Sequence, residues 1–250
     1  MSLWHLEWLR LTRTRRLVAL LGVYVFFGLT GPLTARYLSE ILGSLNTDGV
    51  RVELPDPTPA DGIAQFAGNA SQIGVLVVVL IAASALAFDA RREMAVFLRT
   101  RITGVRAVII PAYAVTTGAA VAALLLGTLA AWYETGVLLG PLPVARMLAG
   151  IGFGAVFLAF AVAAVALAAA AVVRGVLAAG GVTLAVLLAM AILGGIGGLG
   201  RWLPTTLAGA PAGLVDGTAP GFYLPATAVT VAGTAAALAG AIVLGGRREL

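Results

Sequence analysis

The hydrophobic positions of this 250-residue chain gather into six long runs, separated by segments rich in polar residues, Gly or Pro. A helix needs roughly 20 mainly apolar residues to cross the hydrocarbon core of a bilayer. The pattern therefore predicts an all-α polytopic membrane protein, with one transmembrane domain over residues 1–250. The predicted spans are 17–37, 63–88, 107–132, 147–173, 176–198 and 224–244.

Composition supports this class and excludes several chemistries. The mean hydropathy is +1.03 and only 11% of the residues are charged, against about 25% in soluble domains. There is no cysteine, and all 16 basic residues are Arg. A phosphate-binding loop of the P-loop type needs a Lys, so any ATP hydrolysis must occur on another chain. We predict no enzyme activity, no catalytic or metal-binding residue, and no cofactor bound by this chain.

The arginines alternate between the two sides of the predicted membrane. One side would carry most of them, and the other only Arg36, Arg51, Arg146 and Arg201. An excess of Lys and Arg marks cytoplasmic segments, so we expect both termini in the cytoplasm. Abundant Ala, Gly, Val and Arg without Lys indicates a GC-rich bacterial genome, and hence a bacterial inner or plasma membrane. The basic charge is assigned to topology and membrane lipids rather than to nucleic acid.

The first 16 residues predict an interfacial helix. Trp4, Trp8 and Leu11 share one stripe of that helix, with Glu7 and Arg10 roughly opposite. Tryptophan favours the headgroup level of a bilayer. The only histidine, His5, has no acidic cluster beside it and is read as an interfacial residue.

The segment "FDARREMAVFLRTRITGVR" lies between the second and third predicted spans. Wound as a helix, it places Met94, Phe97, Leu98, Ile102 and Val105 on one face, together with the stem of Arg101. Such a helix can lie on the membrane surface or enter the groove of a cytoplasmic partner. A topology signal would need the charge but not the apolar ridge, which favours a docking element.

Polar residues mark the start of the second span. Gln65, Asn69 and Gln72 lie three or four residues apart on one helical face, and lipid offers such side chains no partners. They either pack against another helix or face a substrate. The span centres contain no charged residue, which argues against a proton-coupled carrier.

Taken together, these elements resemble the membrane subunit of an ABC transporter of the type-2 export family. The resemblance covers nearly the whole chain: an amphipathic N-terminal helix, six spans with both ends inside, and a charged loop after span two. In that loop, Asp89 and Glu93 precede "AVFLRTRITGVR", although Met94 and Ala95 replace the Gly-Thr pair of the family. The segment "RWLPTTLAGAPAGLVDG" lies where the family has short re-entrant outer helices between spans five and six.

The resemblance implies a partner for each part. The loop would be a coupling helix that contacts an ATP-binding subunit, present in two copies with ATP and Mg²⁺ bound. A second permease subunit, identical or related, would complete the transporter and meet spans one and five, where Gly194 and Gly198 are candidate dimer contacts. The candidate coupling residues are Glu93, Met94, Phe97, Leu98, Arg99, Arg101 and Ile102.

The function expected from this resemblance is ATP-driven export of an amphiphilic drug, antibiotic, peptide or lipid, with Gln65, Asn69 and Gln72 as candidates for the substrate path. Two alternatives remain. One is a non-transporting membrane scaffold or assembly factor that docks a cytoplasmic partner through its basic loop. The other is a secondary transporter or channel, for which inverted repeats and intramembrane charges are expected and neither is evident.

Overall fold

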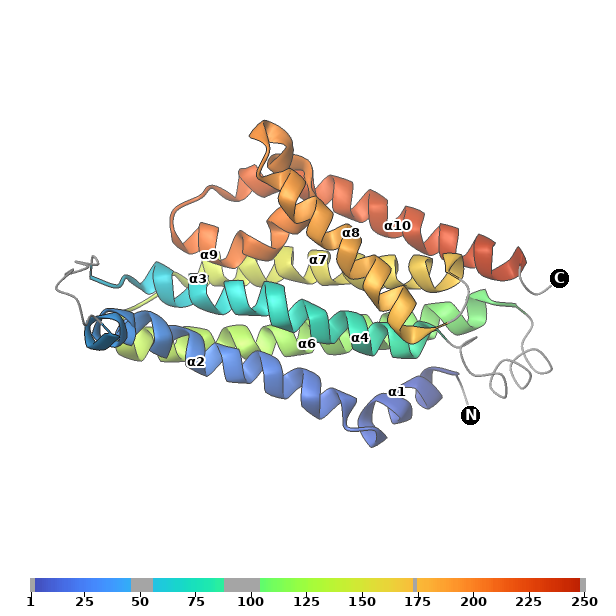
Figure 1. The fold of residues 1–250 in the computed structure, drawn as a ribbon, viewed down its shortest axis with the longest axis horizontal. Helices are drawn as coiled ribbons and strands as arrows, with labels where there is room; N and C mark the ends of the chain where they lie inside the picture. The colour runs from blue at the N-terminus through green and yellow to red at the C-terminus, as the bar shows by residue number, and fades with distance from the viewer. Residues whose placement is uncertain (1–2, 46–55, 88–103, 173–174, 248–250) are drawn as a thin grey trace.

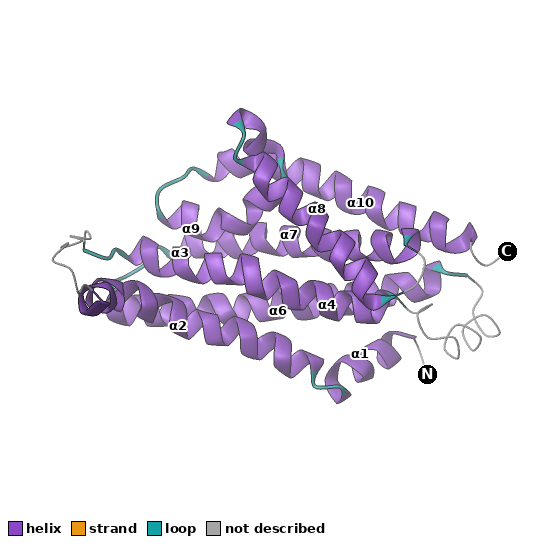
Figure 2. Cartoon of the chain, in the orientation of Figure 1, coloured by secondary structure: helices purple, strands orange, loops and turns teal. Residues whose placement is uncertain are grey.

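The computed structural model describes residues 3–45, 56–87, 104–172 and 175–247, and this part of the chain is helical without a strand. Figure 1 shows a bundle of long helices with roughly aligned axes, except for one that crosses the others at an angle, and Figure 2 shows how little of the chain lies in loops. Six helical segments are long and apolar enough to cross a membrane, which confirms the predicted number of spans. They are Arg16–Leu38, Pro59–Leu86, Arg106–Leu138, Val144–Ala171, Val176–Gly194 and Pro220–Arg247.

The helices follow the chain in the order that the pattern predicts. A short helix α1 (Leu3–Arg13) precedes α2 (Arg16–Leu45), and the second span consists of α3 (Pro59–Asn69), a π-helical turn (Ala70–Gly74) and α4 (Val75–Leu86). The remaining spans are α6 (Arg106–Leu138), α7 (Val144–Ala171), α8 (Val176–Gly194) and α10 (Leu224–Arg247). Between α8 and α10 lie two 3₁₀ helices (Gly197–Trp202 and Pro204–Gly209), α9 (Ala210–Val215) and a 3₁₀ turn (Pro220–Tyr223).

The second span begins earlier than predicted, at Pro59 instead of residue 63. The carboxylate of Asp61 accepts hydrogen bonds from the backbone N–H and the hydroxyl of Thr58, at 2.8 and 2.7 Å. Proline at the first helical position and an acidic residue in the first turn both favour a helix start. The polar residues of this span therefore lie well inside a helix rather than at its entrance.

The fifth span is shorter than predicted. Helix α8 ends at Gly194, and Gly198 belongs to the following 3₁₀ helix. Residues 194–200 read GGIGGLG, and each Gly costs a helix about 1 kcal/mol relative to Ala. The predicted span 176–198 was therefore too long, and Gly194 and Gly198 do not form one small-residue stripe on a single helix.

Close packing between spans depends on small residues. Helix α7 lies against α4, α6, α8, α9 and α10 and is among the two spans with the largest buried share, whereas α8 and α10 have the smallest. A Cβ added to Gly150 of α7 would lie 2.7 Å from the Cα of Pro211 in α9, and one added to Gly154 would lie 2.8 Å from Leu124 in α6. These two glycines therefore permit the close approach of α7 to two neighbours.

Both ends of the chain lie at the same end of the bundle. Helix α1 and the last turn of α10 are on one side in Figure 1, as an even number of crossings requires, and α7 is linked to α8 at this end. At that link Gly175 has φ +132°, a conformation that residues with a side chain rarely adopt. The predicted break between spans four and five at Arg174–Gly175 thus has a backbone cause at Gly175.

Candidate functional site

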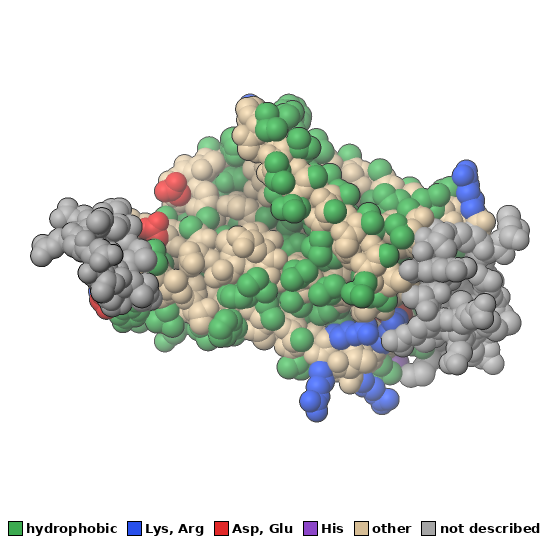
Figure 3. Space-filling model, in the orientation of Figure 1, with side chains coloured by type: hydrophobic (Ala, Val, Ile, Leu, Met, Phe, Trp, Pro, Cys, Tyr) green, Lys and Arg blue, Asp and Glu red, His purple; other side chains and the backbone are tan. Residues whose placement is uncertain are grey.

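The candidate functional site is the end of the bundle that carries α1. The arginines of α1 and of the turn that follows it gather there, and Arg106 and Arg247 lie at the adjoining ends of α6 and α10. In Figure 3, arginine side chains lie around α1, whereas the acidic side chains lie mainly at the opposite end. The charge separation predicted from sequence is thus present along the long axis of the bundle.

Helix α1 folds back against the bundle through a tight corner. Arg15 adopts φ +58°, the left-handed region, between α1 and α2. The Thr14 hydroxyl donates to the carbonyl of Arg10 at 2.6 Å and helps to end α1. This corner lets α1 pack against α2 and the start of α6.

The polar face of α1 points into the protein, not away from it. The guanidinium of Arg10 donates to the carbonyl oxygen of Ser84 at 2.8 Å, in the last turn of α4, where main-chain carbonyls lack helical partners. Glu7 lies 3.6 Å from Arg10, and its side chain is mostly buried. Trp4 and Trp8 are each half exposed, whereas Leu11 is buried. The predicted stripe of Trp4, Trp8 and Leu11 therefore does not form one surface.

Burial also alters the chemistry of Glu7. Desolvation raises the pKa of its carboxyl above the usual value of 4.5, and the charges of Arg10 and Arg16 oppose that shift only in part. The Glu7–Arg10 pair thus combines a hydrogen bond to the end of α4 with a carboxyl that is costly to keep ionised.

The basic segment between α4 and α6 begins and ends at this site. Helix α4 ends at Leu86 and α6 begins at Arg106, both at the α1 end. The candidate coupling residues lie outside the described residues: Glu93, Met94, Phe97, Leu98, Arg99, Arg101 and Ile102. Val105, the last apolar position of the predicted ridge, is buried, and a Cβ added to Gly245 of α10 would lie 2.7 Å from its side chain.

The polar face of span two lies largely on the outside of the subunit. Gln65 and Gln72 are exposed and Asn69 is half buried. No side-chain hydrogen bond joins these three residues to another helix within the described ranges. The amides of Gln65 and Gln72 therefore remain accessible on the surface of the described part of the chain. The π-helical turn at Ala70–Gly74 interrupts the span beside them, and such turns are frequent at functional sites.

The interior between the spans is apolar. Among the described residues of the spans, the buried polar side chains are threonines, apart from Tyr24 and Tyr223 with their hydroxyls: Thr116, Thr128, Thr135, Thr183 and Thr230. Thr183 and Thr230 donate their hydroxyls to carbonyls four residues earlier. No group of acidic or histidine side chains suited to a metal ion occurs in the part of the chain that the structure describes. The described interior therefore offers apolar surface and hydroxyl groups between the spans.

At the opposite end of the bundle, Arg146 of α7 contacts the C-terminal end of α9. Its guanidinium donates to the carbonyl oxygens of Leu214 and Val215 at 3.2 and 3.4 Å, at the C-terminal end of α9, where a basic group is favourable. The ring of Tyr223 lies 5.2 Å from that of Phe153 in α7. The sequence placed Arg146 among the few arginines of the less basic side, but its carbonyl partners in α9 were not predicted.

Comparison with known proteins yields no match: no family model, no curated protein and no solved structure is similar to the chain.

Proposed function

We propose that this chain is the permease subunit of an ATP-driven ABC exporter of the type-2 family, in a bacterial inner or plasma membrane with both termini in the cytoplasm. It works with two ATP-binding subunits, which hold ATP and Mg²⁺, and with a second permease subunit. The absence of lysine supports placing ATP hydrolysis on the partner chain.

One observation carries the proposal. The Arg-rich segment between spans two and three is anchored at the end of the bundle where α1 docks and where the described arginines concentrate. Arg10 binds α1 to the last turn of α4, only a few residues before that segment. A cytoplasmic protein that binds the segment would therefore pull on α1, α4 and α6 together. This is the mechanical requirement of a subunit that converts ATP-driven motion into movement of spans.

The arrangement of polar groups favours an amphiphilic substrate. Apart from tyrosines, the buried polar side chains of the described spans are threonines, whereas Gln65 and Gln72 are exposed on span two. Assembly of two such subunits could enclose these amides in an otherwise apolar path. The exposed surface of α8, with large apolar side chains such as Leu188 and Ile192, is the candidate contact between permeases and lies next to Gly194.

The test is purification of the tagged chain from the membranes of its own cell, with mass spectrometry of the proteins that accompany it. We expect a P-loop ATPase in a stoichiometric amount, one per chain if both permeases are identical and two if they differ, and ATP hydrolysis by the reconstituted complex that responds to amphiphilic substrates. A stoichiometric partner without a nucleotide site would support the membrane scaffold instead. Solute transport by the chain alone would support a secondary transporter.

A further inference from the structure

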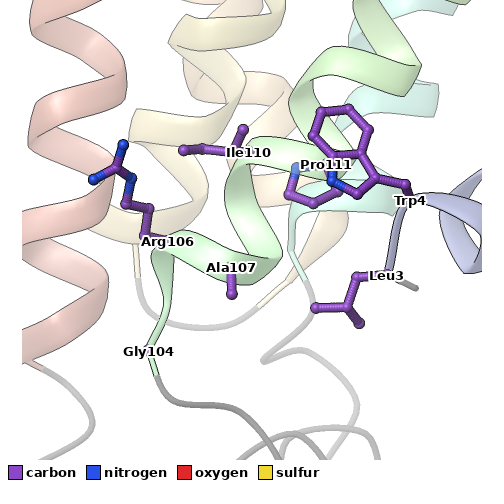
Figure 4. A pocket seen from close by; sticks show the side chains of 7 residues that line it. All are labelled: Leu3, Trp4, Gly104, Arg106, Ala107, Ile110 and Pro111. Carbon is purple, nitrogen blue, oxygen red and sulfur yellow. The ribbon is translucent and has the colours of Figure 1, made fainter. Parts of the chain in front are cut away.

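A cavity of about 520 Å³ lies at the α1 end of the bundle, between the beginning of α1 and the first turns of α6. Leu3 and Trp4 of α1 form one side, and Arg106, Ala107, Ile110 and Pro111 of α6 form the other. Figure 4 shows the Trp4 ring beside Pro111 and the Arg106 side chain on the far side, directed toward α10. The cavity therefore has an apolar floor, with one indole on the α1 side and one arginine on the α10 side.

This combination matches the chemistry of a lipid at the membrane interface. Trp4 is half exposed and Arg106 is exposed, so both can reach a bound molecule. Tryptophan is enriched at the headgroup level, where its ring is apolar and its N–H finds a polar partner. Ile110 and Pro111 belong to the first turns of a membrane-length helix, which puts the apolar floor where acyl chains begin.

The charge around the cavity calls for an anion. Within the described ranges, no carboxylate lies in ion-pair distance of Arg106. Arg247, in the last turn of α10, is a further cation at this end of the bundle, and the one described acidic residue of α1, Glu7, already faces Arg10. Basic pockets between spans on the cytoplasmic side are suited to anionic lipid headgroups.

We propose that this cavity binds an anionic phospholipid, with the Trp4 indole on one side of the headgroup, Arg106 on the other, and Leu3, Ile110 and Pro111 along the upper acyl chain. The apolar floor at the end of the spans favours a lipid over a soluble anion such as inorganic phosphate. The site does not depend on the transport function. If the site is occupied in this way, the position of α1, and with it the Arg10–Ser84 contact, depends on the lipid composition of the leaflet.

Fluorescence quenching by brominated lipids tests the proposal. A chain with Trp8→Phe, Trp132→Phe and Trp202→Phe retains Trp4 as its single fluorophore. The matched control keeps Trp8 instead, because Trp8 lies on the same helix with the same exposed fraction, 50%, but does not line the cavity. Each of these two variants is measured in two kinds of bilayer. One contains brominated phosphatidylglycerol, and the other contains the same fraction of brominated phosphatidylcholine.

We expect phosphatidylglycerol to associate with Trp4 about fivefold better than phosphatidylcholine, the preference that one Arg gives for an anionic surface. Arg106→Gln should remove this preference, whereas Arg13→Gln, an equal loss of charge outside the cavity, should leave it intact. Trp8 should show no such preference. Native mass spectrometry of the chain with its four tryptophans, with and without Arg106→Gln, gives an independent count of retained phosphatidylglycerol.

Three results would overturn the proposal. Equal quenching of Trp4 by the two lipids would mean that the cavity does not select charge. No quenching by either lipid would mean that protein fills it. Reversal of the quenching by added inorganic phosphate would mean that the cavity takes a soluble anion rather than a lipid.

Discussion

Gly28 of α2 and Gly127 of α6 face each other where spans one and three cross. A methyl group on Gly28 would meet the carbonyl oxygen of Gly127, and one on Gly127 would lie 2.7 Å from the carbonyl oxygen of Tyr24. Main-chain atoms of two helices are therefore in direct contact, which is possible only without side chains. This crossing fixes the spacing of two spans that both adjoin α1.

Gly127→Ala should destabilise the folded protein by about 1–3 kcal/mol, because overpacking against backbone atoms forces the helices apart. Gly118→Ala is the matched control: it lies on the same helix, and a Cβ there meets nothing within 4 Å. Thermal unfolding in detergent, followed by size-exclusion chromatography, measures both. Equal melting temperatures for the two variants would show that the helices do not cross at Gly127.

The Arg10–Ser84 contact should hold α1 against the end of span two. Arg10→Ala removes the hydrogen bond and leaves Glu7 without its ion-pair partner, so α1 should move away from the bundle. Because the chain has no cysteine, spin labels at Arg13→Cys and Leu80→Cys report their separation without background. We expect a longer and broader distance distribution in the Arg10→Ala variant, while Thr14→Ala, which removes only a hydrogen bond within the corner, should change it less.

Acidification should strengthen the docking of α1. The pKa of Glu7 is raised in the folded protein, so protonation favours the docked state, and stability is gained as pH falls from neutrality through the raised pKa toward 4.5. The same spin-label pair should show a narrower distance distribution at the lower pH. Glu7→Gln should remove this pH response, and a response that persists in Glu7→Gln would exclude Glu7 as its source.

Substitutions on the polar face of span two can distinguish a role in the substrate path from a role in packing between subunits. If Gln65, Asn69 and Gln72 contact substrate, replacing them with Leu should change transport selectivity while the complex still assembles. Ala64→Leu, at an exposed neighbour of Gln65, controls for added bulk on the surface. Loss of assembly in the Leu variants, with normal assembly of Ala64→Leu, would instead show that the amides hold two subunits together.

Features that depend on neighbouring residues in the sequence were predicted, whereas features that depend on contacts between distant segments were not. The six spans and the break at Gly175 follow from local runs of apolar residues and one glycine. The hydropathy pattern was therefore sufficient to predict them. The end of span five was predicted too late because the glycines within residues 194–200 do not lower the mean hydropathy of that segment enough to mark a boundary. The same glycines nevertheless end the helix. Their effect is on backbone conformation, as the φ of +54° at Gly197 shows.

Contacts between distant segments left no sequence signal. Arg10 binds the main-chain carbonyl of Ser84, which any residue would supply, 74 positions away. The cavity was not predicted for the same reason: packing of α1 on α6 places Trp4 beside Pro111, and no shared sequence pattern links the two residues. Gly127 could not be singled out among 32 glycines, because only the path of the neighbouring helix distinguishes it from Gly118.

The orientation of the bundle in the membrane can be tested with single cysteines in intact cells. Cysteines at Thr47 and Asp216 should react with an impermeant thiol reagent from outside, whereas those at Thr100 and Gly246 should not, because the Arg-rich end is expected in the cytoplasm. Disruption of the cells should make the latter two reactive and serves as the positive control. Labelling of Thr100 from outside would reverse the proposed orientation.

The last prediction concerns the Arg-rich segment as the docking element for the ATP-binding subunit. The segment lies outside the described residues, but its apolar positions Met94, Phe97, Leu98 and Ile102 share one face if it is helical. Buried apolar anchors usually carry more binding energy than charges at the rim of an interface. Phe97→Ala should therefore weaken association by about 1–3 kcal/mol, and Arg99→Ala by about 0–1 kcal/mol, the range for an exposed ion pair. Co-purification of the ATP-binding subunit and substrate-stimulated ATP hydrolysis should both fall in Phe97→Ala, while insertion and pairing of the permease stay normal. Unchanged values for both would return the arginines to the role of topology signals, because the apolar ridge would then have no measurable partner.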